Sequence, residues 1–376
     1  MSLPLRSPLE QEIRRLIAVA GPLPVARYME LCLAHPEHGY YRTRDPLGRA
    51  GDFTTAPEIS QMFGELIGLW AASVWQQMGA PRTVRLVELG PGRGTMMMDA
   101  LRAIRIVPDF YQAVDVHLVD INPALRAAQE ATLAPVKVPV SWHDSLDSVP
   151  DGPLIVLANE FFDALPIHQA VRLGSGWYER VVAIDDKDQF AYGTARLPLP
   201  RFDLLVPRLA QAAPTGSIFE WRPDGAMMAL ARRVRTEGGA ALIIDYGHAR
   251  GNVGDTFQAI VHHAFADPLQ TPGEADLTAH VDFEALARAA GDVGARVHGP
   301  VEQGRFLQRM GIESRAASLM AKASRETADD IASALQRLTG SGRGGMGSLF
   351  KVLGVSDPSL RQLPGISDFG GEEPAA

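Results

Sequence analysis

The chain has 376 residues, a formal net charge of -8, and 46% hydrophobic and 21% charged residues. These proportions are ordinary for a globular protein and exclude a fibrous or wholly disordered chain. An acidic chain is repelled by phosphates, so no nucleic-acid partner is expected. Cys32 is the one cysteine, which excludes an internal disulfide and a cysteine-rich zinc site.

The first 80 residues are predicted to be mainly helical. Ser7-Pro8-Leu9-Glu10 combines an N-cap serine, a helix-starting proline and a capping-box glutamate. A second helix is predicted over Pro24–His35. Thr55–Glu58 is another capping box, and it predicts one long helix with an apolar face formed by Ile59, Met62, Phe63, Leu66, Ile67, Trp70 and Val74.

From Thr83 onward the pattern alternates between apolar strands and helices. Strands are predicted at 84–89, 114–119, 138–141, 154–158 and 240–245, and helices at 95–104 and 122–131. Apolar strands separated by helices indicate a parallel sheet covered on both faces. The predicted fold class is therefore α/β, a doubly wound, Rossmann-like sheet.

The segment between Ala158 and Asp245 is much longer than one crossover connection requires. It contains a predicted β-hairpin, Ile167–Arg172 and Trp177–Ile184, which we interpret as an inserted substrate-facing element. We expect four parts: a helical N-terminal cap at 1–80, a ligand-binding core at 81–166 and 239–300, the insertion at 167–238, and a helical C-terminal extension at 301–376.

The strongest local motif is Glu88-Leu89-Gly90-Pro91-Gly92-Arg93-Gly94, between a predicted strand and a predicted helix. Its G-x-G-x-G spacing departs from the dinucleotide pattern G-x-G-x-x-G, and it carries an acid before the first glycine. It looks like the first motif of class I S-adenosylmethionine methyltransferases. Gly90, Gly92 and Gly94 would let the backbone approach the cofactor, and Glu88 would help to hold its amino group.

Two aspartates end the next strands. Asp120 follows Val114–Val119 and could accept hydrogen bonds from both ribose hydroxyls. Asp144 follows Ser141-Trp142-His143 in the loop that edges the adenine in this fold. It could accept a hydrogen bond from the adenine amino group.

Asn159-Glu160-Phe161-Phe162-Asp163 follows the fourth strand, near the expected position of the reacting methyl. Amine methyltransferases often place an Asn or Asp here to orient a nitrogen lone pair. Carboxylates bind a guanidinium bidentately, so Glu160 and Asp163 could hold an arginine. In the competing interpretation, Glu160 caps the following helix and the phenylalanines are core residues.

Taken together, these segments resemble the MidA-like family, whose mitochondrial members are complex I assembly-factor arginine methyltransferases. Further resemblance lies in Gly51–Ser60, Asp245-Tyr246-Gly247, Gly254-Asp255-Thr256, Asp276–Phe283 and Met346–Leu353. The resemblance implies S-adenosyl-L-methionine as methyl donor and a protein arginine as acceptor. It also implies a link to the large quinone-side subunit of respiratory complex I or its bacterial equivalent.

In this interpretation Asn159, Glu160 and Asp163 form the acceptor side, while Asp52, Thr54, Thr55 and Glu58 close over the cofactor. No metal is expected, since positioning and water exclusion supply much of the rate of methyl transfer. Three alternatives stay open: an NAD-dependent oxidoreductase, a non-catalytic assembly scaffold, and methylation of a small molecule or RNA. We expect a cytoplasmic protein without membrane insertion, and we consider a homodimer as its assembly.

Overall fold

The computed structural model describes residues 6–43, 55–174, 176–202, 206–261, 264–342 and 344–366. The chain forms two compact units. The core unit comprises residues 55–161, 224–249 and 283–376, and the appended unit comprises residues 1–54, 162–223 and 250–282. Each is described by itself.

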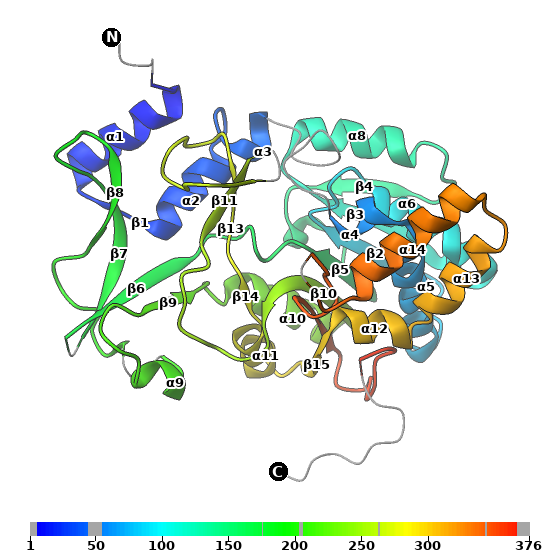
Figure 1. Cartoon of the computed structure of the whole chain (residues 1–376). Helices are drawn as coiled ribbons and strands as arrows, with labels where there is room; N and C mark the ends of the chain where they lie inside the picture. The colour runs from blue at the N-terminus through cyan, green and yellow to red at the C-terminus, as the bar shows by residue number, and fades with distance from the viewer. Residues whose placement is uncertain are drawn as a thin grey trace. The chain divides into compact units, whose positions relative to one another are not determined.

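The core unit is built on a sheet formed by β2 (Val84–Leu89), β3 (Val114–Val119), β4 (Val140–His143), β5 (Leu154–Asn159), β10 (Gly239–His248), β15 (Arg296–Glu302) and β16 (Phe350–Ser356). The strand order is β15-β16-β10-β5-β2-β3-β4. Figure 1 labels the strands of the parallel part, β10, β5, β2, β3 and β4. From β10 to β4 the strands are parallel, whereas β16 is antiparallel to both of its neighbours. The order reverses between β2 and β5, as the doubly wound prediction requires.

Helices complete the core unit: α4 (Ala56–Ile59), α5 (Gln61–Gln77), α6 (Thr95–Ala103), η1 (Ile104–Ile106), α7 (Pro108–Ala113), α8 (Pro123–Leu133), η2 (Leu146–Ser148), α10 (Gly225–Glu237), α11 (Phe283–Asp292), α12 (Gln303–Arg309), α13 (Ile312–Met320) and α14 (Arg325–Thr339). Helix α8 begins at the predicted N-cap, because the Asn122 side chain accepts bonds from the amides of Ala124 and Leu125. This local prediction is confirmed.

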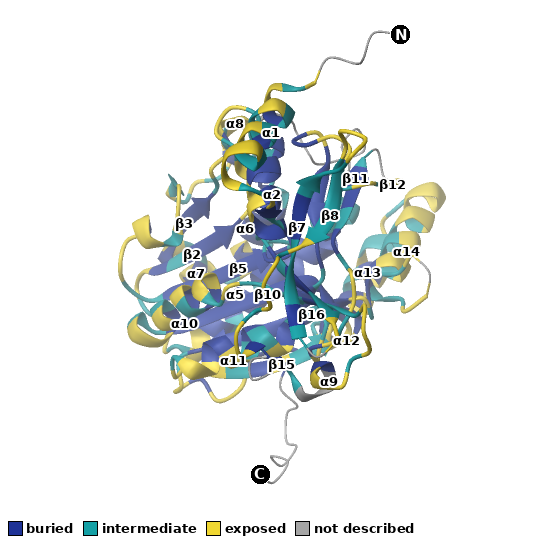
Figure 2. Cartoon of the chain, turned by 90° about the vertical axis from the view of Figure 1, so that its left-hand side faces the viewer, coloured by how far each residue is buried: buried dark blue, intermediate teal, exposed yellow. Residues whose placement is uncertain are grey.

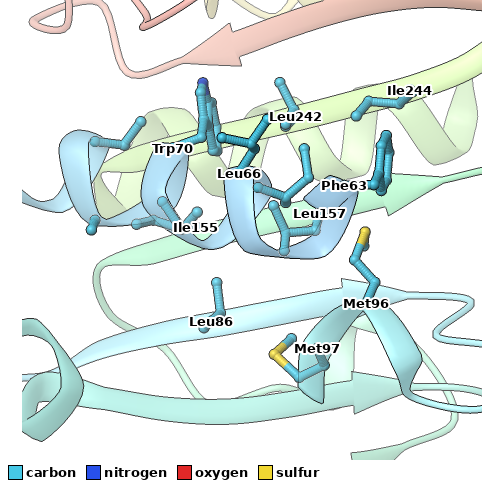
Figure 3. Close-up of a cluster of buried hydrophobic side chains, with 14 of the residues drawn as sticks. Phe63, Leu66, Trp70, Leu86, Met96, Met97, Ile155, Leu157, Leu242 and Ile244 are labelled. Carbon is cyan, nitrogen blue, oxygen red and sulfur yellow. The ribbon is translucent and has the colours of Figure 1, made fainter. Parts of the chain in front are cut away.

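The sheet is buried on both faces, which explains its continuous apolar strands. Val87, Val156 and Ile243 are fully buried on one face, and Figure 2 shows the strands as mostly buried. The alternate residues point to the other face, where α5 packs. Figure 3 shows this second cluster, which includes Phe63, Leu66, Trp70, Leu86, Ile155, Leu157, Leu242 and Ile244.

The prediction of one long helix from Thr55 is wrong. The helix breaks at Ser60, whose backbone is extended and whose side chain caps α5 by accepting the amide of Met62. The Thr55 side chain makes no capping bond to α4. Instead of reaching back to Thr55, the Glu58 side chain accepts a 2.6 Å hydrogen bond from the Thr95 hydroxyl.

The predicted part boundaries also differ from the two units. Helix α5 belongs to the core unit because its apolar face covers the sheet. The C-terminal extension is not purely helical, since β16 inserts between β15 and β10. Strand β16 was missed because its partners lie far away in the sequence, at Gly239–His248 and Arg296–Glu302.

The appended unit contains α1 (Pro8–Ala20), β1 (Leu23–Pro24), α2 (Val25–Ala34), α3 (Tyr40–Thr43), β6 (His168–Leu173), β7 (Gly176–Ile184), β8 (Phe190–Thr194), α9 (Arg208–Gln211), β9 (Ile218–Trp221), β11 (Gln258–Val261), β12 (Ala264–Ala266), β13 (Asp276–Thr278) and β14 (Val281–Asp282). The predicted hairpin is confirmed, since β6 and β7 pair antiparallel in a sheet ordered β1-β7-β6-β9. Strand β11 pairs with β12 and β13. Ser7 caps α1 as predicted, and no helix in the described ranges is long and apolar enough to cross a membrane.

Close packing of α5 on α6 gives a stability test. A Cβ at Gly68 would lie 2.7 Å from the backbone of Ala100, which cannot easily move. We expect Gly68→Ala to lower the free energy of unfolding by about 1–3 kcal/mol in urea titration. Gly225→Ala is the control, because this exposed helical glycine has open space around it. It should be neutral or stabilising by up to about 1 kcal/mol, and equal effects at both positions would contradict the packing argument.

Candidate active site

The predicted motifs meet at one edge of the core sheet. Leu89, the last residue of β2, lies in register with Val119 of β3 and Ala158 of β5. The loops after these strands therefore leave the sheet side by side. A Cβ at Gly90 would lie 3.3 Å from the ring of Phe161, so the glycine turn and the Asn159–Phe161 turn are direct neighbours.

The glycine turn needs its glycines. Gly90, Gly92 and Gly94 have φ angles of 63°, 54° and 80°, a region that other residues adopt only with strain. Gly94 is also the N-cap residue of α6 and offers no capping side chain. The turn thus presents backbone at the positive end of a helix, an arrangement suited to a polar ligand.

Glu88 is a buried carboxylate directly before this turn. The residue is 2% exposed, and among the described residues its Oε2 atom has no hydrogen-bond partner. Burial, with a smaller contribution from the nearby charge of Asp120, raises the pKa of Glu88 to about 8. A cationic group of a ligand beside Glu88 would compensate for this desolvation.

Asp120 sits where β3 ends and is held from two sides. Its Oδ1 accepts the backbone amide of Asn122 at 2.8 Å, and its Oδ2 accepts Nε2 of Gln129 at 2.8 Å. Burial raises the pKa of Asp120 above its usual value. Since a carboxylate offers about four acceptor sites, Asp120 keeps acceptor capacity for a ligand hydroxyl.

Sequence analysis missed Gln129 and Arg126. Gln129 lies in α8, where it and the two leucines four residues before and after it, Leu125 and Leu133, are buried. A glutamine on the apolar stripe of an amphipathic helix was the available signal. The Arg126 guanidinium contacts both the carbonyl of Asp120 and the side chain of Asp144.

Asp144 lies at the edge of this site. Its side chain is 85% exposed, and it pairs with Arg126 at 2.7 Å. The preceding residue, His143, has its Nε2 2.9 Å from Nδ1 of His117, and burial lowers the pKa of both imidazoles. The Trp142 indole donates to Gln129, so its polar edge is turned toward the site.

The turn after β5 has a strained backbone at its acidic residue, Glu160. Glu160 has φ 49°, a left-handed conformation that is uncommon for glutamate. Its Oε1 accepts hydrogen bonds from the Ala56 amide (3.3 Å) and from Nδ2 of Asn159 (3.2 Å). The Glu160 amide donates to Ile244, which fixes this turn to β10.

The remaining predicted residues divide between the units. Thr55 opens α4 in the core unit and is half-buried. Asp163 belongs to the appended unit and is 5% exposed, and its carbonyl accepts bonds from Arg222 and Ala279. Asp52 and Thr54 lie outside the described residues. Within the described ranges, no cluster of three or more His, Cys, Asp or Glu residues could hold a metal ion.

The fold and its acidic glycine turn define a class I methyltransferase. A family described as S-adenosyl-L-methionine-dependent methyltransferase matches residues 66–301. The mitochondrial protein arginine methyltransferase NDUFAF7 homolog of Drosophila melanogaster is 40% identical over 376 residues, covering 92% of this chain and 84% of that protein. The mitochondrial protein arginine methyltransferase NDUFAF7 of Homo sapiens is 39% identical over 350 residues, covering 85% and 77%.

A crystal structure from Burkholderia thailandensis, with S-adenosyl-homocysteine bound, superimposes with a TM-score of 0.79 at 32% identity. It covers 98% of this chain and 96% of that one. The chain therefore belongs to this family of S-adenosylmethionine-dependent methyltransferases. It is an enzyme that takes its methyl group from S-adenosyl-L-methionine, and none of these matches supports an NAD-dependent oxidoreductase or a scaffold.

The buried Glu88 predicts how stability depends on pH. An unfolded glutamate ionises near pH 4.5, whereas folded Glu88 keeps its proton until about pH 8. The free energy of unfolding of the ligand-free protein should therefore decrease by about 3–5 kcal/mol as the pH rises from 4.5 to about 8. Glu88→Gln should flatten this decline in urea titrations from pH 5 to 9, while Glu130→Gln on the exposed side of α8 should not. An unchanged slope in Glu88→Gln would contradict the assigned pKa.

Proposed function

We propose that the chain is a protein arginine N-methyltransferase. The observation that carries the proposal is the Glu160 carboxylate, held in a left-handed turn beside the cofactor-type glycine turn. Strained backbone at the carboxyl edge of a doubly wound sheet is typical of a functional site. The relatives named as protein arginine methyltransferases support this choice of acceptor.

The cofactor would lie along the edge from Glu88 to Asp144. The orphaned Oε2 of Glu88 fits the ammonium group of its methionine part. Gly90, Gly92 and Gly94 would let the backbone of the turn approach the cofactor closely. Asp120 would accept hydrogen bonds from the two ribose hydroxyls. We assign the adenine amino group to Asp144, and we assign Thr54 and Thr55 to cofactor binding from their place in the sequence motif.

On the acceptor side we assign Asn159, Glu160 and Asp163. When bound, the cofactor supplies an electrophilic methyl group. Glu160 would pair with the guanidinium, which orients one nitrogen toward that methyl. Asn159 donates to Glu160 and so restrains the carboxylate. As the new N–C bond forms, the bond between the methyl carbon and the sulfonium sulfur would break and leave S-adenosylhomocysteine. The methylated nitrogen would lose one proton, which Glu160 would accept and pass to solvent, and the carboxylate would lower the cost of the developing positive charge.

The protein partner we propose is the large quinone-side subunit of complex I or its bacterial equivalent. This assignment rests on the resemblance to the complex I assembly factors. We place the reaction in the cytoplasm, and the buried free thiol of Cys32 suits a reducing compartment. A homodimer is a further hypothesis, to be decided by light scattering.

The first test measures arginine methylation of the purified quinone-side subunit by mass spectrometry. Wild type should add methyl to arginine, and Glu160→Gln should lower kcat/KM by roughly a hundredfold because one acceptor-side charge is lost. The Kd of the Glu160→Gln variant for S-adenosylmethionine should stay within about threefold of the wild-type value. Asp120→Ala should raise that Kd by about tenfold or more. Glu130→Gln is the control for neutralising a carboxylate. Methyl appearing on another residue type or on a small molecule would overturn the proposed acceptor.

A second test uses the proton on Glu88. At pH 7 the Glu88 carboxyl group of the ligand-free protein is mostly protonated, since its pKa is about 8. An ammonium placed beside it favours the ionised form, so cofactor binding should release close to one proton. Calorimetry with S-adenosyl-homocysteine in two buffers of different ionisation enthalpy measures this release. It should be absent in Glu88→Gln, and persistence there would argue against the proposed place of the ammonium.

A further inference from the structure

Gln129 joins three parts of the cofactor edge through one buried side chain. Its Nε2 donates to the carbonyl of Gly92 at 2.7 Å and to Oδ2 of Asp120 at 2.8 Å. Its Oε1 accepts the indole N–H of Trp142 at 2.9 Å. The side chain is fully buried, so solvent does not supply substitutes for these bonds.

The amide can take only one orientation. Rotating it by half a turn would bring Oε1 against two acceptors, Gly92 and Asp120, and Nε2 against the Trp142 donor. All three hydrogen bonds would then be lost together. Both hydrogens of the amide are thus committed, one to the glycine turn and one to the carboxylate.

We propose that Gln129 is the positioning residue of the cofactor site, which holds Asp120 and the glycine turn in the geometry that binds S-adenosylmethionine. Asp120 is fixed on one side by its own loop, through the Asn122 amide on Oδ1, and on the other by Gln129, whose amide donates to Oδ2. Without the amide, the carboxylate can rotate and the carbonyl of Gly92 loses its partner. Both changes weaken binding of a ribose diol beside a closely packed turn.

The neighbouring residues make glutamine a specific choice. A glutamate has the same size and could still accept the Trp142 bond. It would, however, place a second negative charge against Asp120, in a cluster that already contains Glu88. A methionine fills a similar volume and makes none of the three bonds.

The inference rests on the proposed placement of the ribose at Asp120, and it is tested by calorimetry with S-adenosyl-homocysteine. We expect Gln129→Met to raise Kd about tenfold or more. Gln303→Met is the matched control, since Gln303 is also fully buried and donates Nε2 to a carbonyl, that of Leu338. Its Kd should stay within about threefold. Gln129→Glu, which preserves the volume, should also weaken binding at pH 8, and its loss relative to wild type at the same pH should be smaller at pH 6.

A double-mutant cycle separates positioning from general damage. If Gln129 acts through Asp120, Asp120→Ala combined with Gln129→Met should bind no more than about threefold worse than the weaker single variant. Under saturating cofactor, Gln129→Met should recover kcat while KM for the cofactor stays raised. Normal affinity in Gln129→Met and Gln129→Glu, or fully additive losses in the cycle, would overturn the inference. Normal affinity in Asp120→Ala would instead overturn the placement of the ribose.

Discussion

The parallel hydrogen bonding of β2 to both β3 and β5 is the constraint on which the site depends. Because β2 is the first strand of the sheet in the chain and lies between these two, its carboxyl end meets both of theirs. The turns at Gly90, Asp120 and Glu160 are forced together by backbone pairing alone. Their side chains could differ without moving the edge, which is why the same fold serves many ligands.

What could be predicted was local. A pattern of only a few residues is enough to predict the strand Val84–Leu89, the glycine turn and the Asn122 cap. Strand β16 could not be predicted this way, because its place between β10 and β15 depends on distant pairing partners. Gln129 was missed for a related reason, since its three partners come together only when α8 packs beside the sheet.

The electrostatics of the edge oppose stability. Burial raises the pKa of both Glu88 and Asp120, and the charge of Asp120 adds to the rise at Glu88. A ligand-free protein gains nothing from placing two carboxylates in a buried corner. This placement is reasonable when a ligand brings the compensating cation and diol, so the unfavourable ligand-free state supports the proposed cofactor position.

Local rules fail around this same edge. Glu58 stands in a capping box, yet it bonds to Thr95 at the start of α6 instead of closing its own cap. Glu160 accepts a left-handed backbone, and its carboxylate accepts the Ala56 amide at the start of α4. Helix α4 is thus tied at one point to the cofactor turn and at another to the proposed acceptor acid. Departures from local conformational preference are expected where function determines the geometry. Here the departures at Glu58 and Glu160 both involve the short helix α4.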